Sequence, residues 1–189
     1  MANFSTAFQL TMGNEGGYAN NPADRGGETY KGIARNFWPS WKGWPIVDQV
    51  KNAKPASLDK ALASRTDLQN LVQDFYKVHF WDINKLDSIS EQDIANELFD
   101  TGVNMGTSVA AKFLQEALNY SNKNQTSYPD LIVDGDIGPK TLATYQKQPN
   151  KKQLLKLLNI LQGERYLNII RNSPSQEVFL SSWFSRVAI

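Results

Sequence analysis

The chain has 189 residues, with 20 Lys and Arg against 19 Asp and Glu, and it contains no Cys. This length allows a sizeable buried core, and a net charge of +1 creates no broad positive field, so nucleic acid is not an expected partner. The absence of Cys excludes disulfides and thiolate chemistry. A single His, His79, argues against a zinc hydrolase, because such enzymes normally use several imidazole ligands. Carboxylates remain as the groups for hydrolysis, and no metal or cofactor is expected.

The first residues lack the basic and apolar regions of a secretory signal peptide. No later stretch reaches the roughly eighteen consecutive apolar residues that cross a bilayer. We therefore expect synthesis in the cytoplasm and no stable membrane insertion.

The first half of the chain alternates between helical and irregular patterns. Apolar residues at helical spacing predict a helix from Asn3 or Ser5 to Met12, which Gly13 ends. Residues 14–32 are rich in Gly, Asn, Asp and Pro, which favours turns and a short irregular hairpin. Three closely spaced tryptophans follow. Short helices are then expected at Ile46–Asn52, after the cap Ser57, and along the apolar stripe from Leu68 to Tyr76.

The second half is more regularly helical. Ser90 and Asp93 resemble a capping box that opens a helix through Phe99, which Gly102 and Gly106 interrupt or pack closely. An apolar stripe follows through Leu118, then a polar loop over 120–130. Pro139 opens the next helix. The longest helix is expected from Asn150 to Arg171, and a last short one from about Gln176 to Arg186. The pattern predicts a mainly α fold that displays function on irregular loops.

One short segment, residues 14–33, gathers the candidate chemistry. A glycosidase needs one protonated carboxyl to act on the leaving oxygen and often a second, ionised one. Glu15 follows an apolar helix, where loss of water contact favours the protonated form, while Asp24 lies in a polar turn and Thr29 could orient water. Aromatic faces that stack on sugar rings are offered by Tyr18, Tyr30, Trp38, Trp41 and Trp44.

A simpler interpretation stands beside this one. Acidic residues in Gly-rich loops are usually turn formers or solvated charges, and tryptophans are more often core or loop anchors than sugar platforms. His79, between aromatic residues, is interpreted as packed or hydrogen-bonded and is left out of the site.

The spacing within this segment carries a family resemblance. Glu-Gly-Gly-Tyr followed by Asn-x-Pro-x-Asp-x-Gly-Gly-x-Thr-x-x-Gly-Ile, from Glu15 to Ile33, resembles glycoside hydrolase family 108, the N-acetylmuramidases of phages and bacteria. The resemblance implies a lysozyme-like helical domain with an irregular active-site loop or small hairpin. It also implies hydrolysis of the β-1,4 bond between N-acetylmuramic acid and N-acetylglucosamine, with Glu15 as the catalytic acid.

The same segment is similar to the wider phage-lysozyme arrangement of Glu, eight residues, Asp and then Thr. Glu15, Asp24 and Thr29 fit this arrangement, although the gap from Asp24 to Thr29 is one residue shorter than in the best-known form. The resemblance implies that Asp24 is a base or charge stabiliser and that Thr29 positions water. This set would suit an inverting reaction.

The second half resembles the peptidoglycan-binding-like region that accompanies this family, at residues 104–106, 113–119 and 134–143. We therefore expect a catalytic region over 1–100 and a helical binding-like region over 101–189. Asp134 and Asp136 lack the ligand spacing of a calcium loop, and a tight turn is preferred. Ser182 stands before Trp183 where family members commonly have Gly.

The predicted function is an N-acetylmuramidase acting on peptidoglycan glycan strands in the periplasm, in the manner of a phage or prophage endolysin. A holin or lysis would give the chain access to the wall. Two alternatives stay open: a lytic transglycosylase, and a non-catalytic wall-binding or secretion-related protein.

Overall fold

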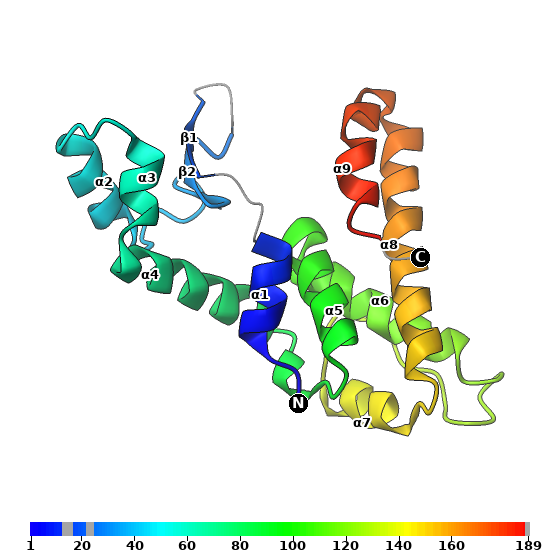
Figure 1. The fold of residues 1–189 in the computed structure, drawn as a ribbon. Helices are drawn as coiled ribbons and strands as arrows, with labels where there is room; N and C mark the ends of the chain where they lie inside the picture. The colour runs from blue at the N-terminus through cyan, green and yellow to red at the C-terminus, as the bar shows by residue number, and fades with distance from the viewer. Residues whose placement is uncertain (13–16, 22–24, 188–189) are drawn as a thin grey trace. The chain divides into compact units, whose positions relative to one another are not determined.

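The protein is described by a computed structural model that covers residues 1–12, 17–21 and 25–187. The chain forms two compact units. The hairpin unit comprises Phe8–His79, and the helical unit comprises Met1–Ala7 together with Phe80–Ile189. Each unit buries apolar side chains of its own (Figure 1).

The hairpin unit contains a small antiparallel sheet followed by helices. The strands pair in the order β1-β2-β3, and they are β1 (Tyr18–Asn20), β2 (Glu28–Tyr30) and β3 (Ile33–Ala34). The helices that follow are α2 (Trp44–Asn52), α3 (Leu58–Ala63) and α4 (Thr66–Tyr76). Figure 1 shows α3 leading from α2 into α4, with β1 and β2 as a separate ribbon in the same unit. The predicted small hairpin is confirmed for the residues that the structure describes.

The turn between β2 and β3 is fixed by its backbone and by α4. Tyr30 pairs with Ile33, so Lys31 and Gly32 form a two-residue loop. Both have positive φ, 46° and 78°, as a type I′ turn requires. The Tyr76 hydroxyl donates to the Lys31 carbonyl at 2.8 Å, and a Cβ added to Gly32 would lie 2.5 Å from that hydroxyl oxygen. Gly32 therefore satisfies both the backbone conformation and the close approach of α4.

The core of the hairpin unit is formed mainly by helical faces. The stripe predicted between Leu68 and Tyr76 is confirmed, because Leu68, Val72, Phe75 and Tyr76 are buried in α4. Each such apolar side chain contributes roughly 1.5–3 kcal/mol when it leaves water. Ser57 accepts a hydrogen bond from the Lys60 amide, which confirms the predicted cap of α3.

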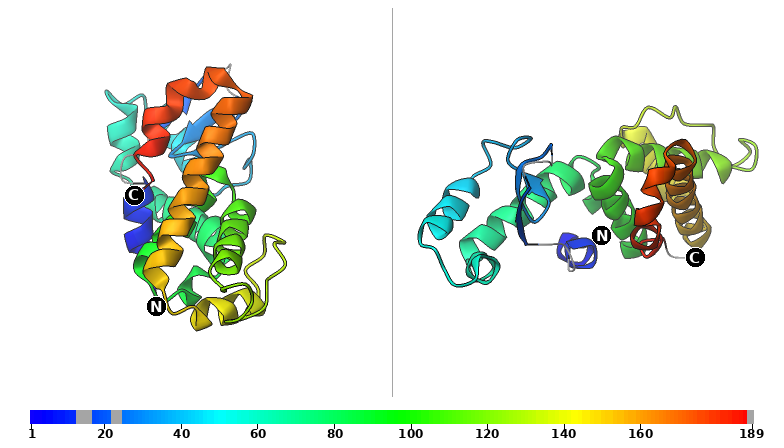
Figure 2. Two further views of the ribbon diagram at one scale, coloured as in Figure 1. Left: turned by 90° about the vertical axis from the view of Figure 1, so that its right-hand side faces the viewer. Right: turned by 90° about the horizontal axis from the view of Figure 1, so that it is seen from above.

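The helical unit is built around three long helices. α5 (Gln92–Met105), α6 (Thr107–Tyr120) and α8 (Lys151–Asn172) pack on one another. Figure 2 shows the C-terminal segment running back alongside α8. The other elements are α1 (Phe4–Met12), which begins in this unit, η1 (Lys77–Asp82), which ends in it, η2 (Leu86–Ser88), α7 (Pro139–Lys147), η3 (Pro174–Phe179) and α9 (Leu180–Phe184).

Several element boundaries agree with the sequence. α1 ends at Met12, and the predicted stop at Gly13 lies outside the described residues. Asn150 caps α8 by accepting a hydrogen bond from the Gln153 amide. The tight turn at Asp134 is confirmed, because its carboxylate accepts from the Asp136 amide at 3.0 Å and Gly135 has a φ of 83°.

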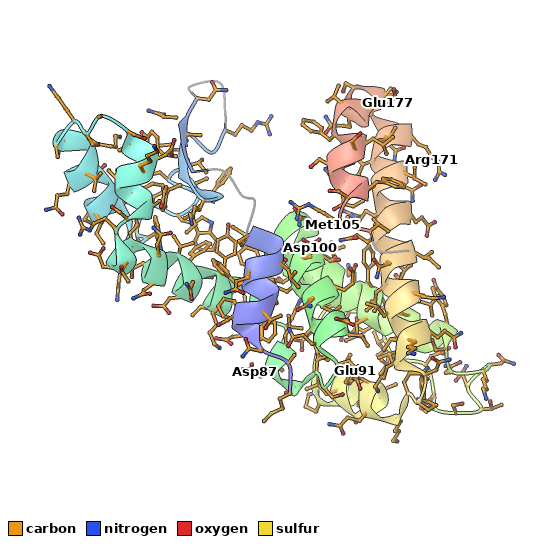
Figure 3. All side chains as sticks on the ribbon, viewed as in Figure 1. Asp87, Glu91, Asp100, Met105, Arg171 and Glu177 are labelled. Atoms are coloured by element: carbon orange, nitrogen blue, oxygen red, sulfur yellow. The ribbon has the colours of Figure 1, made fainter. Side chains whose placement is uncertain are left out.

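The predicted capping box of Ser90 and Asp93 is wrong. α5 begins at Gln92, and Glu91 precedes it with extended backbone and no side-chain cap. The Ser90 hydroxyl instead lies 3.1 Å from the Tyr145 hydroxyl of α7 and donates to the Glu91 carboxylate. Figure 3 shows Glu91 at the start of α5, at the opposite end from Asp100 and Met105. A tertiary contact with α7 therefore replaces the local cap.

The last predicted helix is also different from the structure. Instead of one helix from about Gln176 to Arg186, the chain forms the 3-10 segment η3 and then the single short turn of α9. The mainly α fold is nevertheless confirmed. None of the helices in the described ranges is both long and apolar enough to span a bilayer.

Candidate active site in the hairpin unit

The predicted carboxylate pair lies outside the described residues. Glu15 falls in residues 13–16 and Asp24 in residues 22–24. The structure does describe Thr29 and the five predicted aromatic residues, together with α1, β1 and β2, which flank the two segments. The geometry of the candidate site is therefore built from these residues.

Thr29 is the central residue of β2. It pairs with Ala19 of β1 and with Ala34 of β3, so two strands fix its backbone. Its hydroxyl donates to the Gly27 carbonyl at 3.2 Å, and the side chain is half-buried. A hydroxyl that donates in one direction keeps lone pairs for accepting a hydrogen bond from water. This arrangement is compatible with the predicted role in positioning water.

The two predicted tyrosines differ in exposure. Tyr18 is half-buried on β1, and its hydroxyl donates to Glu28 at 2.7 Å. Tyr30 is only 1% exposed, and its hydroxyl accepts a hydrogen bond from Gln69 at 3.0 Å. Tyr18 can thus present part of its ring to a ligand, whereas the Tyr30 ring belongs to the core of the hairpin unit.

The three predicted tryptophans form a connected cluster with graded exposure. Trp44 is 3% exposed, and its indole N–H donates to the Trp38 carbonyl at 2.8 Å. Trp41 is half-buried, lies edge-to-face against Trp44 and donates to the Leu71 carbonyl at 3.3 Å. Trp38 is 37% exposed and is the most accessible of the three indoles. Trp44 is therefore the buried part of the cluster, and Trp38 is its solvent-exposed part.

The His79 ring packs against other aromatic rings, as predicted. Its ring centroid is 4.4 Å from that of Trp38 and 4.7 Å from that of Phe75. Next to Trp38 in the chain, Phe37 is 65% exposed and adds an aromatic face that the sequence analysis did not single out.

Glu28, which was also not singled out, lies at the centre of a network of charged and polar side chains. Its side chain is only 11% exposed, and one oxygen accepts from the Tyr18 hydroxyl and from the Lys51 ammonium group. The other oxygen lies 2.7 Å from Arg35 Nε. Two hydrogen-bond donors, from β1 and α2, and one ion-pair partner, the residue after β3, therefore surround a single carboxylate.

Arg35 extends this network to α2. Its guanidinium binds the Asp48 carboxylate through two hydrogen bonds, of 2.7 and 3.1 Å. It also lies 4.4 Å from the centroid of the Trp44 ring, in cation–π geometry. The charge network and the tryptophan cluster consequently share one side chain.

Burial and hydrogen bonding act in opposite directions on the Glu28 carboxyl. Burial raises its pKa, but the hydrogen bonds from Lys51 and Tyr18 and the charge of Arg35 outweigh burial and hold the pKa below its usual value. The hydrogen bond to Glu28 raises the pKa of Lys51 in turn. Glu28 is thus ionised at neutral pH and acts as a fixed acceptor.

The alternation of side chains between the two faces of β2 provides a signal in the sequence that Glu28 needs charged partners. Side chains two residues apart on a strand point to the same face, so Glu28 shares the face of Tyr30, while Thr29 points to the other. An acidic residue on the face of a buried tyrosine needs cationic partners, which Lys51 and Arg35 supply.

No group of three or more His, Asp or Glu side chains suited to a metal ion occurs among the residues that the structure describes.

Comparison with known families matches both regions of the chain. Residues 8–106 match the family described as glycosyl hydrolase 108, and residues 109–188 match the family described as a predicted peptidoglycan domain. The first match covers more than half of the 189 residues, and the chain belongs to the glycosyl hydrolase 108 family. The resemblance drawn from the residues is confirmed, and both matches support a peptidoglycan-related role, hydrolytic or binding.

Among solved structures, the chain is similar to SagA of Brucella abortus. The TM-score is 0.58 at 22% identity, and the alignment covers 97% of this chain and 88% of the SagA chain. This similarity indicates a shared fold. A comparison with curated proteins gives no match.

Proposed function

We propose that the protein is an N-acetylmuramidase that hydrolyses the β-1,4 bond between N-acetylmuramic acid and N-acetylglucosamine. The observation that carries this proposal is the glycosyl hydrolase 108 match over residues 8–106. That range includes Glu15 and Asp24 in the spacing of the phage-lysozyme arrangement, followed by Thr29 one residue closer to Asp24 than in the best-known form.

Each proposed residue has one chemical task. Glu15 is the general acid that protonates the glycosidic oxygen as the bond breaks. Asp24 is the ionised partner, which activates water or stabilises the positive charge that develops on the sugar. Thr29 orients the attacking water through its hydroxyl, and its place between β1 and β3 supports this role. An inverting outcome is proposed for this set.

We assign two roles to the aromatic side chains: exposed rings contact the sugar, and buried rings support the exposed ones. Tyr18, Trp38 and Trp41 are at least partly accessible and are proposed to stack on pyranose rings, with the exposed Phe37 beside them. Tyr30 and Trp44 are buried and are proposed to hold these faces in place from the core. Glycan strands are also proposed as the ligand of residues 109–188.

The proposed setting is the bacterial cell wall, reached by an endolysin of a phage or prophage. Access would come through a holin or through lysis. Expression with and without a holin, followed by the optical density of the culture, tests this setting, because lysis that needs the holin is the expected result.

The first experiment digests purified Gram-negative peptidoglycan with the wild type and with Glu15→Gln, and identifies the soluble products by mass spectrometry. The wild type should release reducing muropeptides whose new reducing end is N-acetylmuramic acid. Glu15→Gln removes the proton donor but keeps the shape, so the rate should fall by about 10²–10⁴-fold in a folded protein. Asp93→Asn, a matched carboxylate-to-amide change at an exposed residue of α5 that lies outside the proposed site and outside residues 109–188, should leave the rate unchanged.

Other outcomes separate the alternatives. Products lighter by one water would identify a lytic transglycosylase. No product from the wild type, together with retained binding to the wall, would identify a non-catalytic binding protein.

A further inference from the structure

The Glu28 network joins all three strands of the small sheet to one helix. Tyr18 lies on β1, Glu28 on β2, and Arg35 directly after β3, while Lys51 and Asp48 lie on α2. Backbone hydrogen bonds between strands this short give limited stability on their own. The carboxylate of Glu28 adds contacts of 2.7 Å to Tyr18 and 2.7 Å to Arg35, and a further contact to Lys51.

The strands held by this network adjoin the segments that carry the proposed carboxylates. In the sequence, Tyr18 follows Glu15 by three positions and Glu28 follows Asp24 by four. Glu28 is also the neighbour of Thr29 in β2. Any shift of β1 against β2 would therefore change where both segments start or end, and a displacement of about 1 Å in a catalytic group can lower the rate by about 10²-fold.

We propose that Glu28 is a positioning residue for the hydrolysis proposed above, acting through Tyr18, Lys51 and Arg35 to lock β1, β2 and β3 onto α2. This inference rests on the proposed muramidase function. Glu28 does not need to touch the sugar or exchange a proton, because its carboxylate already accepts hydrogen bonds from Tyr18 and Lys51 and forms an ion pair with Arg35.

The chemistry of the network explains why a carboxylate is required at this position. Tyr18 and Lys51 share one carboxylate oxygen of Glu28, and Arg35 faces the other. An amide that keeps its oxygen for Tyr18 and Lys51 would therefore direct its N–H₂ group at Arg35, which is a donor only. The cations would then lose their shared counter-ion while still partly buried, which is unfavourable. The sheet should loosen against α2, and the helical unit should be unaffected.

The test compares the wild type, Glu28→Gln and Glu28→Asp on soluble peptidoglycan oligosaccharides, with rates expressed per folded molecule from denaturant unfolding. Glu28→Gln should lower kcat by about 10–100-fold and change KM by less than about threefold, because the ligand still binds while the reacting groups are misplaced. Glu28→Asp retains the charge and should restore part of kcat. Asp67→Asn removes the exposed ion pair with Arg65 in the same unit and is the matched control.

A second readout separates positioning from general destabilisation. Hydrogen exchange of amides in β1 and β2 should become at least about tenfold faster in Glu28→Gln, while amides of α5 and α8 keep their protection. If Glu28→Gln does not fold, Lys51→Met removes one donor and leaves the contacts with Tyr18 and Arg35, and it should give a smaller fall in kcat with the same pattern of exchange.

The outcomes distinguish the two proposals. A wild type that releases reducing ends, together with a Glu28→Gln protein of equal kcat or unchanged strand exchange, would overturn the positioning role and leave the muramidase function intact. A wild type that cleaves no glycan would overturn the function and, with it, this role.

Discussion

Glu97 is a buried carboxylic acid in the middle of α5, outside the proposed active site. Glu97 is 8% exposed, and its carboxyl group accepts a hydrogen bond from the Thr101 hydroxyl at 3.4 Å. Burial, and secondly the negative charge of Asp100, raise its pKa to about 8, with the Thr101 hydrogen bond acting weakly against them. Glu97 is therefore protonated in the folded protein at neutral pH.

This pKa predicts that stability falls as pH rises. Below the ordinary pKa of 4.5, Glu97 is protonated in both the folded and unfolded states, so its contribution is fully present. Between pH 4.5 and about 8 only the unfolded state ionises, so the free energy of unfolding should fall by about 1.4 kcal/mol per pH unit from this group. Denaturant unfolding of the wild type and Glu97→Gln over this range measures the difference.

The difference between the two proteins isolates Glu97 from the other titrating groups. Glu28 acts in the opposite direction, because its lowered pKa adds stability that is lost on acidification, and it is present in both proteins. Stability curves that stay parallel from pH 4.5 to 8 would show that Glu97 does not titrate as its surroundings predict.

At the scale of single residues, a sequence motif can propose the residues of a site but not the contacts that hold them. Thr29 and Tyr18 could be proposed from motif spacing, and the family match supports that motif. Glu28 could not be proposed from spacing alone, because its partners Lys51 and Arg35 lie 23 and 7 positions away and meet it only through the fold. Likewise, nothing in the sequence marks which of five aromatic rings are exposed.

At the scale of elements, helices with a clear apolar face or a clear capping residue were predicted well, and elements with neither were not. α4 has a buried apolar stripe and α8 has the capping residue Asn150, and the predicted limits of both agree with the structure within a residue or two. The π-helical η1 was not predicted, since such a short i→i+5 segment has no characteristic periodicity. η3 and α9 replace the last predicted helix, and their residues are mostly exposed, so no buried face fixes their helical type.

The β2–β3 turn gives a prediction at this scale. Gly32→Ala should destabilise the hairpin unit by about 1–3 kcal/mol, because Ala is disfavoured at a φ of 78° and its Cβ would meet the Tyr76 hydroxyl. In a Tyr76→Phe background the clash disappears and only the backbone cost remains. The cost of Gly32→Ala should therefore be smaller there, with a coupling energy of about 0.5–3 kcal/mol measured by denaturant unfolding.

Gly106→Ala provides the matched comparison for this cycle. Gly106 has a φ of 101°, but no atom lies within 4 Å of an added Cβ. Its substitution should destabilise the protein through backbone strain alone and should show no coupling to Tyr76→Phe. Additive costs for Gly32→Ala and Tyr76→Phe would mean that the turn moves away from α4 without resistance.

At the scale of the whole molecule, the family matches divide the chain between residues 106 and 109. Compactness divides it between Ala7 and Phe8 and again between His79 and Phe80. The two divisions measure different things, because sequence similarity follows inheritance and compactness follows packing. The boundary predicted near residue 100 stays a prediction. A helix boundary can be predicted from local pattern, whereas a unit boundary depends on which long-range contacts form.

The overall charge predicts how the full chain should bind the wall. A net charge of +1 gives the full chain little long-range attraction, because the excess of 10 Lys and Arg over 6 Asp and Glu in residues 109–188 is offset by 13 Asp and Glu against 10 Lys and Arg in residues 1–108. Binding of the full chain to glycan strands should therefore rely on short-range contacts. The test uses full-length Glu15→Gln, which is not expected to digest the ligand. This protein should co-sediment with purified peptidoglycan sacculi to a similar extent in about 50 mM and about 300 mM salt. Salt screens mainly exposed long-range charge interactions, so short-range contacts should be little affected. A strongly basic protein should lose binding over the same range and serves as the control. A steep loss for Glu15→Gln would mean that a local cluster of charges, which the near-neutral total conceals, dominates recognition of the wall.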